Sequence, residues 1–197
     1  MMYVVGAVAI GCLLGITGVQ AASLPIPRVD YSANRVIESE AGTFTGKVYA
    51  AKDKERTEIA LRGMESVTIV RRDKRLGWLL MPSHRLYSQL DLARAQQQSG
   101  SPADDVSVEE IGLDTVEGHA TTKYKLLMKD GSAGGFIWIT GEGIAIKMDM
   151  LTKEGGKKSR MTMTLTNLKV GPQDAQLFEL PRGYNSMPSV GSFGVGR

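Results

Sequence analysis

Short runs of alternating apolar and polar residues, separated at regular intervals by turn residues, most constrain how this chain can fold. Eleven runs are predicted as β-strands: 29–39, 43–51, 55–62, 66–72, 76–81, 85–89, 106–115, 119–129, 133–140, 143–152 and 159–170. Most connections between them are too short for a parallel crossover. We therefore expect neighbouring strands to pair antiparallel, hairpin after hairpin, in an all-β sandwich or barrel.

Glycine content and the late strands support this expectation. Glycine accounts for 23 of 197 residues, above the typical ~7%, and proteins with many tight turns need such residues. The alternation is cleanest over 144–150 and 161–166, where every second residue is isoleucine, leucine or methionine. A strand places these residues on one face, whereas a helix would scatter them around its circumference.

One interval, from Leu90 to Asp105, has no strand pattern. Asp91 is a suitable N-cap and residues 92–98 are good helix formers, so we predict a short helix laid across the sheet. The fold class is therefore mainly β, with about eleven strands and one helix as a lid.

The N-terminal segment predicts export. No charged side chain precedes Arg28, and the apolar run ends in Val19-Gln20-Ala21, a pattern that signal peptidase recognises. We expect a signal peptide over 1–21, an extended linker over 22–28, a single domain over 29–184 and a flexible tail over 185–197. Two alternatives stay open: the segment is retained as a membrane anchor, although its glycines weaken it, or the chain is lipidated at Cys12.

Several classes of function lack their usual residues. A net charge of +3 is too small to argue for nucleic-acid binding. One cysteine and two histidines exclude disulfide frameworks and Cys/His metal clusters. The sequence contains no nucleophile elbow, P-loop or dinucleotide fingerprint, and His84 and His119 stand on predicted turns. We therefore expect no catalytic residue, no metal and no cofactor.

An ordered set of short strings resembles a known family. They are Gly46-Lys47-Val48-Tyr49, Ile69-Val70-Arg71-Arg72-Asp73, Trp78-Leu79-Leu80-Met81-Pro82, Ile111-Gly112-Leu113-Asp114, Thr122-Lys123-Tyr124, Trp138-Ile139-Thr140 and Leu177-Phe178-Glu179-Leu180-Pro181. In this order they resemble a secreted bacterial family of unknown function related to the outer-membrane lipoprotein-sorting, LolA-like superfamily. The resemblance covers about residues 29–187.

The resemblance implies a curved, incomplete antiparallel barrel, a periplasmic location and a hydrophobic cavity of the kind that receives lipoprotein acyl chains. The chain departs from the carriers in having only one short predicted helix as a lid. The cavity candidates are Trp78, Tyr87, Leu92, Phe136, Trp138, Ile146, Met148, Met150, Met161, Met163 and Leu165. Methionine suits variable apolar ligands, but the same residues are equally expected in an ordinary core.

A basic cluster is the second candidate surface. Arg71, Arg72, Lys74 and Arg75 stand at a predicted turn and could meet an acidic partner, although charges at turns are usually only solvated. The predicted function is a non-enzymatic periplasmic carrier of a lipid, lipoprotein or other apolar ligand, touching membranes only peripherally or transiently. The alternative is a cell-envelope interaction or sensing module with a filled core and a protein partner.

Overall fold

The computed structural model describes residues 24–61, 63–93, 105–154 and 156–187. These residues form twelve strands: β1 (Tyr31–Ser39), β2 (Gly42–Ala51), β3 (Lys54–Leu61), β4 (Met64–Arg71), β5 (Leu76–Met81), β6 (Leu86–Asp91), β7 (Val106–Val116), β8 (His119–Met128), β9 (Ala133–Thr140), β10 (Ala145–Glu154), β11 (Lys157–Val170) and β12 (Asn185–Ser186). Short 3-10 helices are η1 (Arg72–Lys74), η2 (Pro82–His84) and η3 (Ala175–Phe178). All eleven predicted strands are confirmed, and β12 is additional.

The strands belong to one sheet with the order β12-β6-β5-β4-β3-β2-β1-β11-β10-β9-β8-β7. Hairpins connect β1 to β6 and β7 to β11, as predicted. The two series join where β1 pairs antiparallel with β11. The strands β6 and β7, on either side of the interval 90–105, do not pair, and the edge strands of the sheet are β12 and β7. The predicted helix over 91–98 lies mostly outside the described residues.

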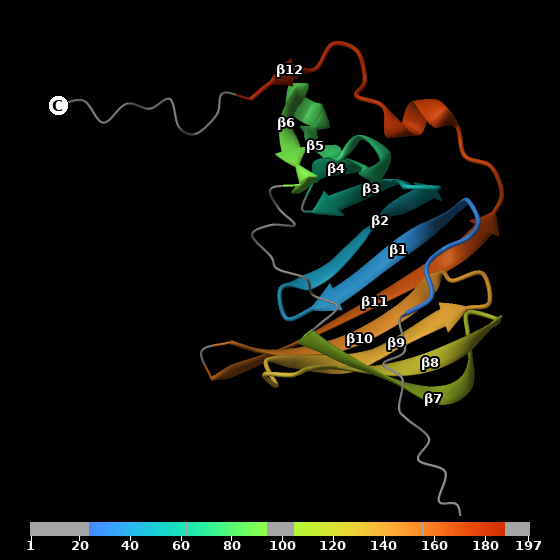
Figure 1. The fold of residues 1–197 in the computed structure, drawn as a ribbon. Helices are drawn as coiled ribbons and strands as arrows, with labels where there is room; N and C mark the ends of the chain where they lie inside the picture. Colours follow the sequence, from blue (N-terminus) through green and yellow to red (C-terminus); the bar gives the residue numbers. More distant parts are fainter. Residues whose placement is uncertain (1–23, 62, 94–104, 155, 188–197) are drawn as a thin grey trace, which may run out of the picture.

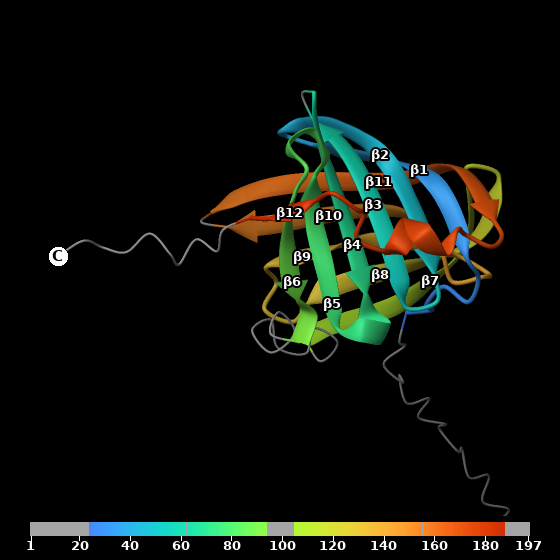
Figure 2. The ribbon, with the colours of Figure 1, turned by 90° about the horizontal axis from the view of Figure 1, so that it is seen from above.

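The sheet is strongly bent (Figures 1 and 2). The strands β3–β6 lie above β7–β10, and β1, β2 and β11 connect the two layers. Register shifts interrupt β7 between Glu110 and Gly112, β10 between Ala145 and Lys147, and the β1–β11 pairing between Ser32 and Asn34. Such bulges increase local twist and allow a sheet to curl. The predicted curved, incomplete barrel is therefore confirmed.

The C-terminal segment shows which side of the upper layer is the outer one. After β11 the chain runs over β3–β5 on the side away from the lower layer (Figures 1 and 2). There Phe178, only 1% exposed, packs against Val67, Ile69 and Leu80. These side chains point outward, so the residues that alternate with them point inward.

The ends of the described chain are anchored to the sheet. Ile26 lies so close to the β9–β10 turn that a Cβ on Gly143 would stand 2.1 Å from its carbonyl oxygen. The amide of Arg28 donates to the carbonyl of Glu142 at 2.9 Å. At the other end, β12 pairs in parallel with Leu86 and Tyr87, so the region predicted as a tail begins inside the sheet.

The predicted signal peptide and residues 188–197 lie outside the described part of the chain. Among the described residues, no helix has the length and apolar character needed to cross a membrane.

Candidate functional site

A row of apolar residues crosses the inner face of the sheet. On β10 and β11, Met148 lies opposite Met163 and Met150 opposite Met161; these four residues are called the methionine stripe. On the next strand, Ile37 of β1 lies opposite Met163. The structure thus places the predicted candidates Met148, Met150, Met161, Met163 and Leu165 on one face, while Ile146 lies at the bulge of β10.

The inner face becomes more exposed along β10 and β11. Ile146 and Leu165 are buried, with 0% and 1% exposure. Met148, Met150 and Met163 are half-buried, and Met161 is 42% exposed. The stripe therefore presents accessible apolar surface next to a closed core, which ordinary core packing would not leave.

A polar network lies beside this apolar row, and the sequence analysis did not find it. Arg35 of β1 donates from Nη1 to the Thr57 hydroxyl at 3.2 Å, and its Nη2 lies 3.5 Å from Glu55. Thr57 donates to Glu55 at 3.2 Å, and Arg72 reaches the other oxygen of Glu55 at 3.5 Å. The Nε of Arg35 is buried and has no hydrogen-bond partner.

Gly46 allows β2 and β3 to approach each other closely beside this network. It lies opposite Arg35 on β2, and a Cβ there would stand 1.8 Å from the carbonyl oxygen of Glu58. The signal for the network was present in the sequence, because Arg35 interrupts an inward series of Tyr31, Ala33 and Ile37.

A cavity of about 530 Å³ adjoins the network at the beginning of β1. It is lined by residues 26–31, 50–55 and Arg72. Glu55 and Arg72 therefore belong both to the cavity lining and to the polar network, and Tyr31 lies beside them. Burial, helped by the charge of Glu55 and partly opposed by Arg35 and Arg72, raises the pKa of Tyr31.

The four aromatic candidates are not part of the inner face. Trp78 and Tyr87 pack in the outer cluster around Phe178. Phe136 and Trp138 pair with Asp149 and Lys147, which alternate with the methionines. Trp138 nevertheless packs in one buried cluster with Ile146 and Leu165, and Phe136 and Met163 pack against that cluster. That these aromatics line a ligand cavity stays a prediction. Strands that are apolar on both faces do not show by alternation which face is inner.

Trp138 is instead held on the outer face by polar groups. Its Nε1 donates to Asp114 at 2.7 Å, and the ammonium groups of Lys123 and Lys147 lie 4.8 and 4.9 Å from its ring. The hydrogen bond from Trp138 keeps the pKa of Asp114 below its ordinary value. The remaining candidate, Leu92, is half-buried directly after β6.

The basic cluster is mainly a clamp on the C-terminal segment. Arg71 is 4% exposed and makes a bidentate pair with Asp73 at 2.8 and 2.7 Å. It also bonds Glu179 and donates to the carbonyl of Phe178 at 3.4 Å. The proposed partner role of Arg71 is corrected accordingly, while Arg72, Lys74 and Arg75 remain exposed.

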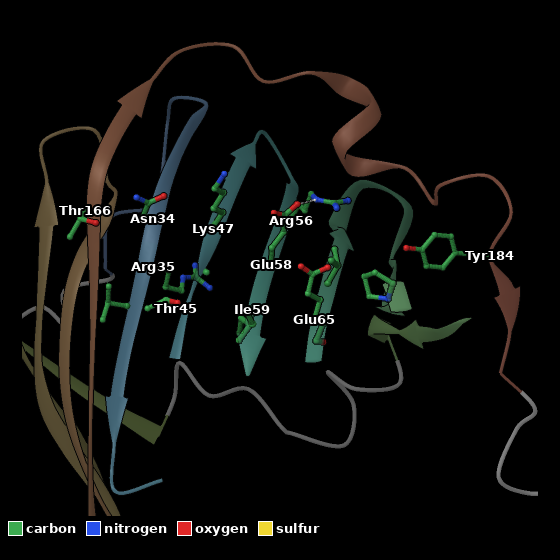
Figure 3. Close-up of a pocket in the computed structure, with 16 residues that line it drawn as sticks. Asn34, Arg35, Thr45, Lys47, Arg56, Glu58, Ile59, Glu65, Thr166 and Tyr184 are labelled. Atoms are coloured by element: carbon green, nitrogen blue, oxygen red, sulfur yellow. Dashed lines mark hydrogen bonds and ion pairs between the residues drawn. The ribbon is translucent and has the colours of Figure 1, made fainter. Parts of the chain in front are cut away.

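A second cavity, of about 630 Å³, lies on the outer face of β1–β4 (Figure 3). Tyr184 points toward these strands from the C-terminal segment. Arg56 donates to Glu58 at 2.7 Å and to the carbonyl of Leu177 at 3.2 Å, which ties the segment to β3. The lining also includes Arg35, Lys47 and Glu65, so this cavity carries charged side chains, which the methionine stripe does not.

The described residues contain no group of three or more His, Cys, Asp or Glu side chains suited to a metal ion. His84 is exposed and its Nδ1 meets only the neighbouring Ser83 hydroxyl, at 2.9 Å.

Solved structures share this fold at low identity. An uncharacterised conserved protein from Thermus thermophilus is 12% identical with a TM-score of 0.56, covering 81% of this chain and 90% of its own. MucB is 17% identical with a TM-score of 0.50, covering 77% of this chain and 57% of its own. The Pseudomonas aeruginosa MucA/MucB complex is 16% identical with a TM-score of 0.49, and the match covers 77% of this chain and 56% of that chain. The chain spans little more than half the length of MucB.

These likenesses concern the fold alone. Comparison with curated protein sequences finds no match. Residues 35–144 match the family described as a domain of unknown function, DUF4412. Because this match spans more than half of the sequence, the chain belongs to the DUF4412 family.

Proposed function

We propose that this protein is a non-enzymatic binding or carrier protein of the periplasm that takes an apolar ligand, such as a lipid or a lipoprotein acyl chain, on its inner face. The observation that carries the proposal is the methionine stripe, which stays partly exposed on the concave side of a bent sheet. Flexible, polarisable methionine side chains adapt to chains of different shape. The predicted signal peptide and the membership of a family resembling secreted proteins support the location.

The proposal is tested with 1-N-phenylnaphthylamine, an uncharged probe whose fluorescence rises in apolar surroundings. The full mature protein, mildly delipidated, is expected to bind it saturably. The double variant Met148→Gln, Met163→Gln keeps side-chain length but places amides on the stripe, and we expect it to weaken binding about tenfold. The matched control is Met64→Gln, because Met64 is 65% exposed and lies at the β3–β4 turn.

Absence of saturable binding by the wild-type protein would refute the proposal. Equal weakening by the stripe variant and the Met64 control would refute the placement of the ligand.

An envelope interaction module is the second candidate, and the outer cavity favours it. That cavity carries Lys47, Glu65 and a tyrosine of the C-terminal segment on strands remote from the stripe. This function predicts that an envelope protein is captured by the wild-type chain, that capture is lost in Lys47→Glu, and that the stripe variant leaves it unchanged.

A further inference from the structure

Charge is almost absent from the inner face of β1–β6. Among the described side chains that point inward from these strands, only Arg35 and Glu55 are charged; the others are apolar, glycine, serine or threonine. A guanidinium on such a surface is costly unless its hydrogen bonds are satisfied. Arg35 is not fully satisfied, because its Nε is buried without a partner.

The local charge balance is also incomplete. Arg35 and Arg72 both face the single carboxylate of Glu55, at 3.5 Å each. In the lining of the adjoining cavity, Arg28, Lys52, Lys54 and Arg72 outnumber Asp30, Asp53 and Glu55 by one positive charge, and Arg35 adds a second. An anionic group placed beside the two guanidinium groups would balance this charge. It could also accept hydrogen bonds from the guanidinium N–H groups that Glu55 and Thr57 do not engage.

The inner face changes character along the direction of the strands. Counting along β1 from Arg35, the next inward residue toward the β1–β2 turn is Ile37, which meets Phe44 and Met163. In the other direction the inward series ends at Tyr31, in the cavity of about 530 Å³ that Glu55 and Arg72 also line. At about 3.3 Å per residue, each half extends roughly 13 Å from Arg35. The apolar half and the charged half thus share one face of the sheet.

We propose that the ligand is an amphiphile with one anionic headgroup, a carboxylate or a phosphate, which pairs with Arg35 and Arg72 while its acyl chain lies along the methionine stripe. This inference rests on the proposed function and adds the polarity and direction of the ligand. Arg72, whose side chain is 57% exposed, stands at the mouth of the site, and Arg35 stands at the boundary between its two halves.

The test compares dodecanoate, dodecyl phosphate and dodecanol, which share one alkyl chain and differ in the headgroup. Each displaces 1-N-phenylnaphthylamine from the full mature protein at neutral pH. We expect at least one of the two anions to bind about tenfold or more tightly than dodecanol, as hydrogen bonds to charged groups allow. The anion that shows the preference identifies the headgroup class.

Arg35→Gln and Arg72→Gln are expected to remove most of this preference without changing the affinity for dodecanol. Arg72→Gln carries the test if Arg35→Gln fails to fold, because Arg72 is a surface residue. Arg160→Gln is the matched control: this arginine is 66% exposed on the outer face, paired with Asp149, and its loss should leave the preference intact.

Two results would overturn the inference. If dodecanol binds as tightly as both anions, or if the arginine variants weaken all three ligands equally, the headgroup site is wrong while apolar binding stands. If none of the three displaces the probe and the probe itself does not bind, the proposed function fails and this inference fails with it.

Discussion

Replacing Arg71 with methionine should release the C-terminal segment from the outer face of the sheet. Arg71 is 4% exposed and binds Asp73, Glu179 and the carbonyl of Phe178. Methionine fills much of the same volume but donates no hydrogen bond. The substitution therefore removes the clamp and leaves the packing beneath it largely intact.

The expected loss follows from the partners. Hydrogen bonds to charged groups contribute about 1.5–3 kcal/mol. The side chains of Asp73 and Glu179 are 34% and 50% exposed and can be rehydrated when the guanidinium is removed. We therefore take about 2 kcal/mol for Arg71 as a whole, which corresponds to a fall in Tm of roughly 4–8 °C for a domain of this size.

The loss of stability caused by Arg71→Met should become smaller as the pH falls. The Arg71 hydrogen bond lowers the pKa of Asp73 from 3.8 to about 2. Partial burial opposes ionisation of Glu179, but Arg71 and Lys74 together hold its pKa below its ordinary value. Both pKa values are lower in the folded protein than in the unfolded chain. The ordinary pKa values are 3.8 for Asp73 and 4.5 for Glu179, so their contribution is complete above about pH 5 and is lost as the pH falls from 5 toward 2.

The assay is urea unfolding of wild type and Arg71→Met at several pH values between 3 and 7. The difference in free energy of unfolding should be largest at pH 7 and shrink below about pH 5. Lys74→Met is the control, since Lys74 is 47% exposed and lies 3.4 Å from Glu179; it should change stability by less than ~0.5 kcal/mol. If Arg71→Met has the same free energy of unfolding as wild type, or if the difference does not change with pH, the contacts of Arg71 do not stabilise the fold.

Two further substitutions test the packing. Phe178→Ala removes a ring that is 1% exposed and should lower the free energy of unfolding in urea by about 3–5 kcal/mol. The control Leu113→Ala, at a side chain that is 90% exposed, should lower it by less than ~0.5 kcal/mol. Similar losses in the two variants would contradict the packing described. Gly46→Ala would place a Cβ 1.8 Å from the Glu58 carbonyl oxygen and should lower Tm by roughly 5 °C or more. In the control Gly141→Ala the added Cβ meets no atom within 4 Å, so Tm should stay unchanged. An unchanged Tm in the Gly46 variant would refute the close approach of β2 and β3.

Particular residues show how far sequence reasoning reached. The alternation over residues 161–166 predicted both a strand and a shared face for Met161, Met163 and Leu165, and the register confirms the face. Alternation is a local property, so it needs no knowledge of the partner strand. Trp138 lies in a strand that is apolar on both faces, so alternation does not show which face points inward.

Arg71 illustrates the other limit. In the sequence it belongs to a run of basic residues at a turn, where charges are ordinarily solvated. In the structure it is buried because Glu179, 108 residues later, returns to cover it. The same holds for Arg35, whose partners Thr57 and Glu55 come from a strand two positions away in the sheet. No local pattern distinguishes such arginines from surface ones.

Turn residues and period-two patterning by themselves determined the positions of the eleven long strands and their hairpin pairing, because both depend only on neighbouring residues. The pairing of β1 with β11, the position of β12 and β7 at the two edges of the sheet and the assignment of the inner face were decided by the tertiary structure alone. These features join segments more than a hundred residues apart or depend on how bulges bend the sheet, and contacts of that kind leave no signature in the local sequence.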